Sequence, residues 1–162
     1  MAKRSQPRRS APPSPGLAHG EFVRYPGTRA DVHDLLERLA AVAGDSPDLG
    51  TTGLSLDRTR VVVRWFGELP GPVRAVVDAA PAGLTVSVVP TRFRPGDLRT
   101  EAARLAAEHP DVVVAATARP EGDGIEVLVT PDVAASAGSP EQALAGVTSA
   151  FPLSAEIGEP GR

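Results

Sequence analysis

Few residues of this chain combine the type and the spacing that catalysis needs. The 162-residue sequence contains no cysteine, which excludes disulfides, thiolate zinc sites, iron–sulfur clusters and cysteine nucleophiles. Its three histidines, His19, His33 and His109, form no close pair. The sequence contains no G-x-S-x-G elbow, no P-loop and no G-x-G-x-x-G after a strand. We therefore predict that the chain is not an enzyme and that it has neither catalytic residues nor a cofactor.

One acidic stretch contains residue types that bind metals. Asp31, His33 and Asp34 lie close together, and Glu37 shares a helix face with His33 because four positions separate them. A metal site needs a third ligand, and the sequence offers none at a useful spacing. We interpret this stretch as the solvated face of a helix and predict no metal site.

The elements that must position any site follow from apolar periodicity and punctuation. Helical spacing predicts helices over 29–43, 70–80, 95–108 and 140–149, the first capped by Thr28 and the last by Ser139. Alternating or β-branched runs predict strands over 52–57, 60–66, 84–89, 111–118, 125–130 and 153–157.

The order of these elements contains an internal repeat. Residues 52–90 and 111–157 each consist of a hairpin, a helix that starts at proline and a returning strand. This pattern predicts an α+β fold of two ββαβ modules, with a mixed sheet and helices on one face. An alternative begins at Leu84 and gives a ferredoxin-like βαββαβ order, with the first helix and hairpin as an N-terminal addition.

Charge and proline content set the first residues apart. Residues 1–24 contain five basic residues and one acidic residue, against a net charge of −3 for the whole chain. We predict that residues 1–27 form a disordered, basic, proline-rich tail, that 28–158 form a single domain, and that 159–162 form a polar end. The tail gives at most weak, salt-sensitive contacts with nucleic acid.

No apolar run in the sequence is long enough to form a membrane helix. The residues after Arg8 and Arg9 also lack the apolar core of a signal peptide. We therefore predict no membrane partner and a cytoplasmic protein, with secretion only if the start codon is assigned wrongly.

One strand presents a candidate interaction surface. In the run RVVVRWF, Trp65 and Phe66 are adjacent and point to opposite faces of the sheet. We predict that Trp65 belongs to the core and that Arg64 and Phe66 form an interaction surface on the outer face, unless Phe66 packs under a loop.

The stretch GLSLDRTRVVVRW follows a leucine-rich amphipathic helix. Together they resemble the propeptide domain of alpha-lytic and streptogrisin-type serine proteases. The resemblance rests on Leu35, Leu36 and Leu39 in the helix, Gly53 and Asp57 around the first strand, and the valines Val61, Val62 and Val63, and it extends over about 30–130.

The resemblance implies a folding assistant or inhibitor that packs against a protease, although the family's protease domain does not follow in this sequence. We expect a non-catalytic protein-binding module with a protein partner, for which a protease is the candidate. The alternative is a small regulatory or ligand-binding domain of ferredoxin-like type that self-associates through its sheet as a homo-oligomer. The two hypotheses predict different molecular masses in solution. A module that binds a partner keeps a free strand edge and is a monomer, whereas the self-associating domain is a homo-oligomer.

Overall fold

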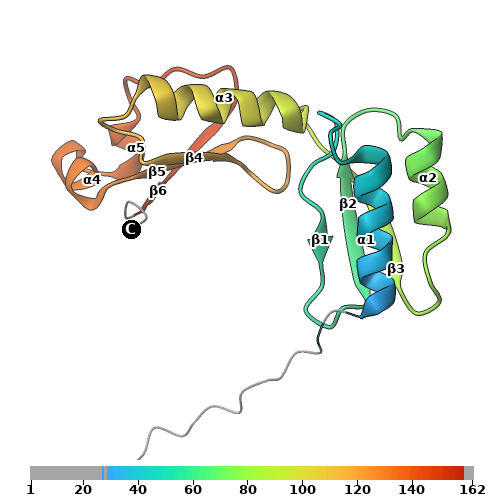
Figure 1. The fold of residues 1–162 in the computed structure, drawn as a ribbon. Helices are drawn as coiled ribbons and strands as arrows, with labels where there is room; N and C mark the ends of the chain where they lie inside the picture. The colour runs from blue at the N-terminus through green and yellow to red at the C-terminus, as the bar shows by residue number, and fades with distance from the viewer. Residues whose placement is uncertain (1–26, 28, 159–162) are drawn as a thin grey trace, which may run out of the picture.

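The computed structural model describes residue 27 and residues 29–158, which fold as two modules of similar topology (Figure 1). In each module a helix precedes an antiparallel strand pair, and a helical crossover leads to a third, parallel strand. The first module comprises α1 (Ala30–Ala43), β1 (Gly53–Leu54), β2 (Arg60–Trp65), α2 (Gly71–Asp78) and β3 (Thr85–Pro90). The second comprises α3 (Pro95–Glu108), β4 (Ala115–Ala118), β5 (Ile125–Val129), α4 (Pro131–Ala137), α5 (Pro140–Ala143) and β6 (Leu153–Ile157). The predicted α+β class with two ββαβ repeats is confirmed.

Each module has a three-stranded mixed sheet, in the order β1-β2-β3 or β4-β5-β6. The middle strand pairs antiparallel with the strand before it and parallel with the strand after it. This order excludes the ferredoxin-like alternative, because β3 pairs with β2 and joins no sheet with β4, β5 and β6. β1, β3, β4 and β6 are therefore all edge strands.

Each module has its own hydrophobic core. In the first core, Val32, Leu35 and Leu39 of α1 pack on every second residue of β2. The last of these β2 residues is Trp65, which we predicted to belong to the core. Trp65 is 3% exposed, and its Nε1–H donates to the backbone oxygen of Glu68 over 3.1 Å. In the second core, α3 packs in the same way on β5, through a set of fully buried residues: Leu98, Leu105, Ile125, Val127 and Val129.

The first predicted hairpin is correct in position but its first strand is shorter than predicted. β1 covers only Gly53–Leu54, because the turn begins at Ser55. The carboxylate of Asp57 accepts from the Ser55 hydroxyl at 2.5 Å and from the Thr59 backbone N–H at 3.1 Å. These local bonds take the place of strand pairing, as is common for Asp and Ser in turns.

The predicted strand over 111–118 also begins later, at Ala115. The backbone N–H groups of Val112 and Val113 both donate to the carbonyl of His109, so this stretch continues the end of α3 as a turn. Its apolar character comes from burial without strand pairing, since Val113 is 3% exposed.

The predicted helix over 140–149 is wrong in extent. Two short helices form instead, α4 in the stretch that we expected to be a loop and α5 after it. The signal for α4 was present, because Thr130 accepts a capping bond from the Val133 N–H at 3.3 Å and proline follows at the first helical position. The predicted cap of α5 is confirmed, with the Ser139 hydroxyl accepting from the Gln142 N–H at 3.1 Å.

Some predictions lie outside the described residues. They are the disordered tail over 1–27, apart from residue 27 itself, the Thr28 cap and the polar end over 159–162. Within the part of the chain that is described, α1 has no side-chain capping bond at Arg29. No described helix has the length and apolarity needed to cross a membrane.

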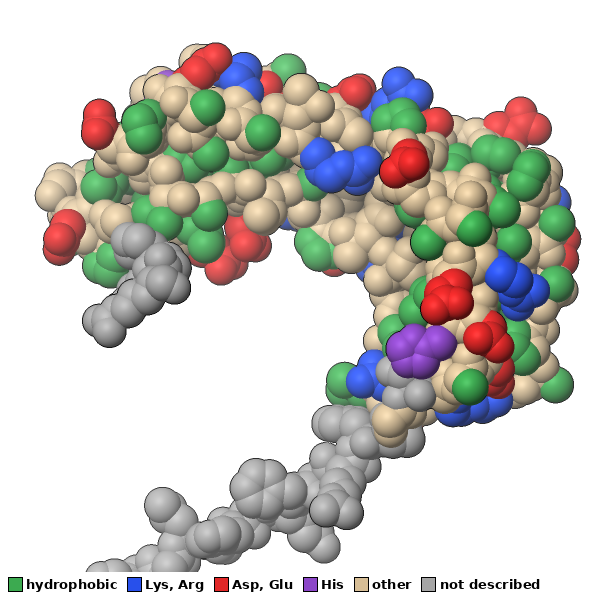
Figure 2. Space-filling view, in the orientation of Figure 1, with side chains coloured by type: hydrophobic (Ala, Val, Ile, Leu, Met, Phe, Trp, Pro, Cys, Tyr) green, Lys and Arg blue, Asp and Glu red, His purple; other side chains and the backbone are tan. Residues whose placement is uncertain are grey.

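The two modules meet at one end of each, so that the molecule is bent around a hollow (Figure 2). At this junction the loop before β1 lies against the start of α3. The Gly96 N–H donates to the Pro47 carbonyl over 2.7 Å, and a Cβ at Gly96 would stand 2.6 Å from the Pro47 Cβ. Only glycine permits this approach. An ion pair between Arg94 and Asp48, 2.6 Å apart, adds to the contact and raises the pKa of Arg94.

Candidate functional site

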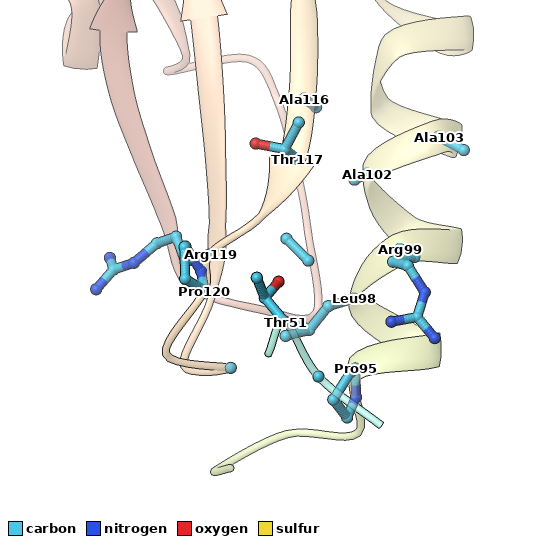
Figure 3. A pocket seen from close by; sticks show the side chains of 13 residues that line it. Thr51, Pro95, Leu98, Arg99, Ala102, Ala103, Ala116, Thr117, Arg119 and Pro120 are labelled. Carbon is cyan, nitrogen blue, oxygen red and sulfur yellow. The ribbon is translucent and has the colours of Figure 1, made fainter. Parts of the chain in front are cut away.

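A depression of about 360 Å³ lies where the two modules meet (Figure 3). One wall is α3, through Leu98, Ala102 and Ala103, and the other is residues 116–120, from β4 into the following turn. The loop residues Gly50 and Thr51 of the first module close one end. We call this depression the junction groove. Its walls consist mainly of alanine, glycine and proline, so backbone atoms are accessible within it.

The β4 wall presents unpaired backbone groups. In an antiparallel strand, alternate residues direct both N–H and C=O to the partner strand. The Arg119 N–H donates to Gly124 over 2.9 Å, and the register pairs Thr117 with Glu126, so the odd-numbered residues of β4 face β5. The N–H and C=O groups of Ala116 and Ala118 therefore point to the free edge of the sheet, at the groove. This geometry is suitable for adding a further strand.

The closed end of the groove is held by Arg64, one of the two predicted interaction residues. The Gly50 N–H donates to the Arg64 carbonyl over 2.9 Å, and the Arg64 Nη1 donates to the Thr51 carbonyl over 3.0 Å. Arg64 is half-buried on the face of sheet β1-β2-β3 that the helices leave open. It therefore positions a groove-lining loop, a role that the sequence pattern did not reveal.

The charge of the groove lining is purely basic. Arg99 and Arg119 are its two charged residues, and no aspartate or glutamate lines it among the described residues. Arg119 is paired with Asp123 at 2.7 Å. Arg99 donates to the Leu49 carbonyl over 3.1 Å and has no carboxylate within ion-pair distance in the described range. A bound group with a negative charge would find its partner at Arg99.

The second predicted interaction residue, Phe66, lines a different depression. This open groove of about 610 Å³ also includes Phe93 and Phe151, whose rings form an edge-to-face pair with centroids 5.2 Å apart. The guanidinium of Arg92 lies 5.1 Å above the centre of the Phe93 ring. Phe66 is 37% exposed. Arg64 does not line this groove, so the structure places the two predicted residues at separate sites.

The residues with metal-binding character do not assemble a site. No group of three or more His, Cys, Asp or Glu side chains that could hold a metal ion occurs in the described part of the chain.

The Arg104 guanidinium and the Ser149 hydroxyl lower the pKa of Glu101 to about 2. Glu101 lines neither groove, and its hydrogen bonds join α3 to the loop before β6.

The sequence pattern contained no direct signal for the junction groove. Its lining residues are small or loop-forming, and such residues are typical of turns and tightly packed helices as well. Comparisons with known proteins add no candidate, since no family model, no curated protein and no solved structure matches the chain.

Proposed function

We propose that this chain is a non-catalytic protein-binding module that takes an extended segment of a partner protein into the junction groove. The observation that carries the proposal is the free edge of β4, which presents the backbone groups of Ala116 and Ala118 beside an apolar wall of α3. A segment lying there adds a strand to the sheet. Main-chain hydrogen bonds give affinity in this binding mode, and pockets for alternate side chains give specificity.

The dimensions favour a short segment with small apolar side chains. The volume of about 360 Å³ accommodates a few residues, and Leu98, Ala102 and Ala103 line one side of it. Alternate side chains of an added strand point to opposite faces. Those on one face contact α3, and those on the other remain in solvent.

The basic lining favours an acidic residue in the bound segment. Arg99 has no carboxylate partner in the described structure, and the lining adds no negative charge that would repel one. A carboxylate at this rim gains a charge-assisted hydrogen bond. The likeness to protease propeptides makes a chymotrypsin-type serine protease the first protein to test as the partner.

The test uses two tryptophan variants of α3. Ala103 and Ala107 are both exposed and lie one helical turn apart, but only Ala103 lines the groove. The substitution Ala103→Trp fills the groove, and Ala107→Trp is the matched control. Linear peptides are selected from a displayed library for binding to the full chain. In parallel, a purified chymotrypsin-type protease is titrated against the full chain.

We expect selected peptides to contain small apolar residues and an acidic residue. They should bind the wild type and Ala107→Trp equally and bind Ala103→Trp at least tenfold more weakly. Amide hydrogen exchange at Ala116 and Ala118 should slow on binding, because their N–H groups gain acceptors. Failure to select any linear peptide, or equal binding to Ala103→Trp, would refute the proposal. Enhanced melting temperature with apolar small molecules alone would instead support a ligand-binding domain.

A further inference from the structure

The outer edge of β3 is the most exposed apolar strand edge of the first module. Five of its six residues are exposed, and Val88 and Val89 are 37% and 42% exposed. The strand TVSVVP contains no charged residue. Natural edge strands are usually protected by charges, bulges or covering loops. Apart from its terminal Pro90, this edge has none of these protections among the described residues.

The backbone direction of β3 fixes which groups are free. The N–H of Thr85 donates to the Thr59 carbonyl over 2.8 Å, and the N–H of Thr91 donates to the Trp65 carbonyl over 3.0 Å. The odd-numbered residues of β3 therefore face β2, and Val86, Val88 and Pro90 face outward. Proline has no N–H, so the free donors of this edge are those of Val86 and Val88.

These free groups are complementary to themselves. If two copies of β3 meet antiparallel about a two-fold axis at Ser87, Val86 of one copy lies opposite Val88 of the other. Each of these two pairs forms two N–H···O=C bonds, so all four free donors of the two copies are satisfied. The next pair outward brings Leu84 opposite Pro90. Neither has a free N–H, because the Leu84 N–H donates to the Pro81 carbonyl over 3.1 Å.

The side chains are compatible with the same register. Ser87, small and uncharged, meets its own copy at the axis, where a charged residue would meet a like charge. Thr85 lies opposite Val89, and Val86 opposite Val88, which are pairs of β-branched residues that pack well across strands.

We propose that the edge of β3 binds the edge of β3 in a second copy of this chain, which forms a two-fold dimer with one continuous six-stranded sheet. A single strand edge is smaller than the roughly 800 Å² per partner of a standard stable complex. The dimer is therefore weak and depends on concentration. It leaves the junction groove free, since no residue of β3 lines that groove.

The experiment is sedimentation velocity of the full chain from micromolar to millimolar concentration. We expect the average mass to rise from 16.7 kDa towards twice that value. Ser87→Lys and Ser87→Asp should each weaken dimerisation at least tenfold, because the Cβ atoms of the two opposed residues stand about 5 Å apart at the axis and both side chains then carry the same charge. A mixture of the two variants should restore association.

Two further variants test the register. Thr85→Lys is the matched control, since its copies stand about 13 Å apart, beyond the screening length at physiological salt, and it should still dimerise. Val88→Pro removes a free N–H while leaving the β2–β3 bonds intact, and it should weaken dimerisation about tenfold or more. A wild type that stays monomeric at all concentrations would overturn the proposal. So would a dimer that Ser87→Lys and Val88→Pro leave unchanged.

Discussion

Replacing Glu101 by glutamine should destabilise the second module, and the effect should disappear in acid. Glu101 lies on α3 with its side chain 14% exposed and accepts bonds from Arg104 at 2.7 and 2.8 Å and from the Ser149 hydroxyl at 2.8 Å. Arg104 also donates to the Thr148 carbonyl over 3.0 Å. The substitution therefore removes the negative charge of the carboxylate whose hydrogen bonds connect α3 to the loop before β6.

The magnitude follows from the pKa of Glu101, which lies near 2 against an ordinary value of 4.5. At about 1.36 kcal/mol for each pKa unit, this lowering corresponds to an upper bound of about 3 kcal/mol. Water screens part of it, because the side chain of Arg104 is 37% exposed. We expect the free energy of unfolding at neutral pH to fall by about 2 kcal/mol, within the usual range for hydrogen bonds to charged groups.

The pH dependence has a definite sign. A carboxylate whose pKa is lowered by folding stabilises the native state above its unfolded pKa, and this stabilisation is lost as pH falls towards the folded pKa. The wild type should therefore lose its advantage over Glu101→Gln between about pH 5 and pH 2.

Urea denaturation of both proteins over this pH range measures the difference. Glu108→Gln is the matched control, because Glu108 also pairs with Arg104 but is 54% exposed. It should cost at most about 0.5 kcal/mol. A difference between wild type and Glu101→Gln that stays constant from neutral pH to acid would refute the reasoning.

Three further predictions concern the turns and the cores. Gly122→Ala should lower the melting temperature clearly, since Gly122 has φ of 70° and its new Cβ would stand 2.5 Å from a threonine side chain. Gly146→Ala, with nothing within 4 Å, is the control and should change it little. Leu35→Ala and Leu105→Ala, each fully buried in a different core, should each cost about 2–5 kcal/mol and accelerate amide exchange mainly in their own module. Equal acceleration in both modules would contradict the separation of the cores. The carboxyl of Asp57 should titrate near pH 2 by NMR, because hydrogen bonds from Ser55 and Thr59 lower its pKa, and a midpoint near 4 would contradict those bonds.

Much of the fold was predictable because its causes are local. The β-branched run around Val61 and Val63 predicted a strand, and the spacing of Leu35 and Leu39 predicted a helix that packs on it. The internal repeat could be predicted from the sequence because it depends on the order of these locally determined elements. The errors occurred where side chains form local bonds that compete with regular structure, as at Asp57, or where a short helix begins at a threonine cap, as at Thr130.

The candidate sites were less predictable. The sequence identified Arg64 and Phe66 as exposed residues of a strand but placed them on one surface. The structure directs Arg64 to the loop at Thr51 and Phe66 to the groove with Phe93 and Phe151. These neighbours are distant in sequence, and periodicity within one element gives no information about them.

The sequence alone determined most of the elements and their order, the internal repeat, the apolar faces of the main helices and strands, and the lack of recognisable catalytic motifs. All of these depend on spacing within a segment and on side-chain chemistry. Only the tertiary structure decided that β3 and β4 are edge strands, that the modules form separate sheets, and that α3 and β4 enclose a groove. Strand order and packing between modules arise from contacts between segments far apart in the chain, so the free edges proposed here as binding surfaces exist only once the chain has folded.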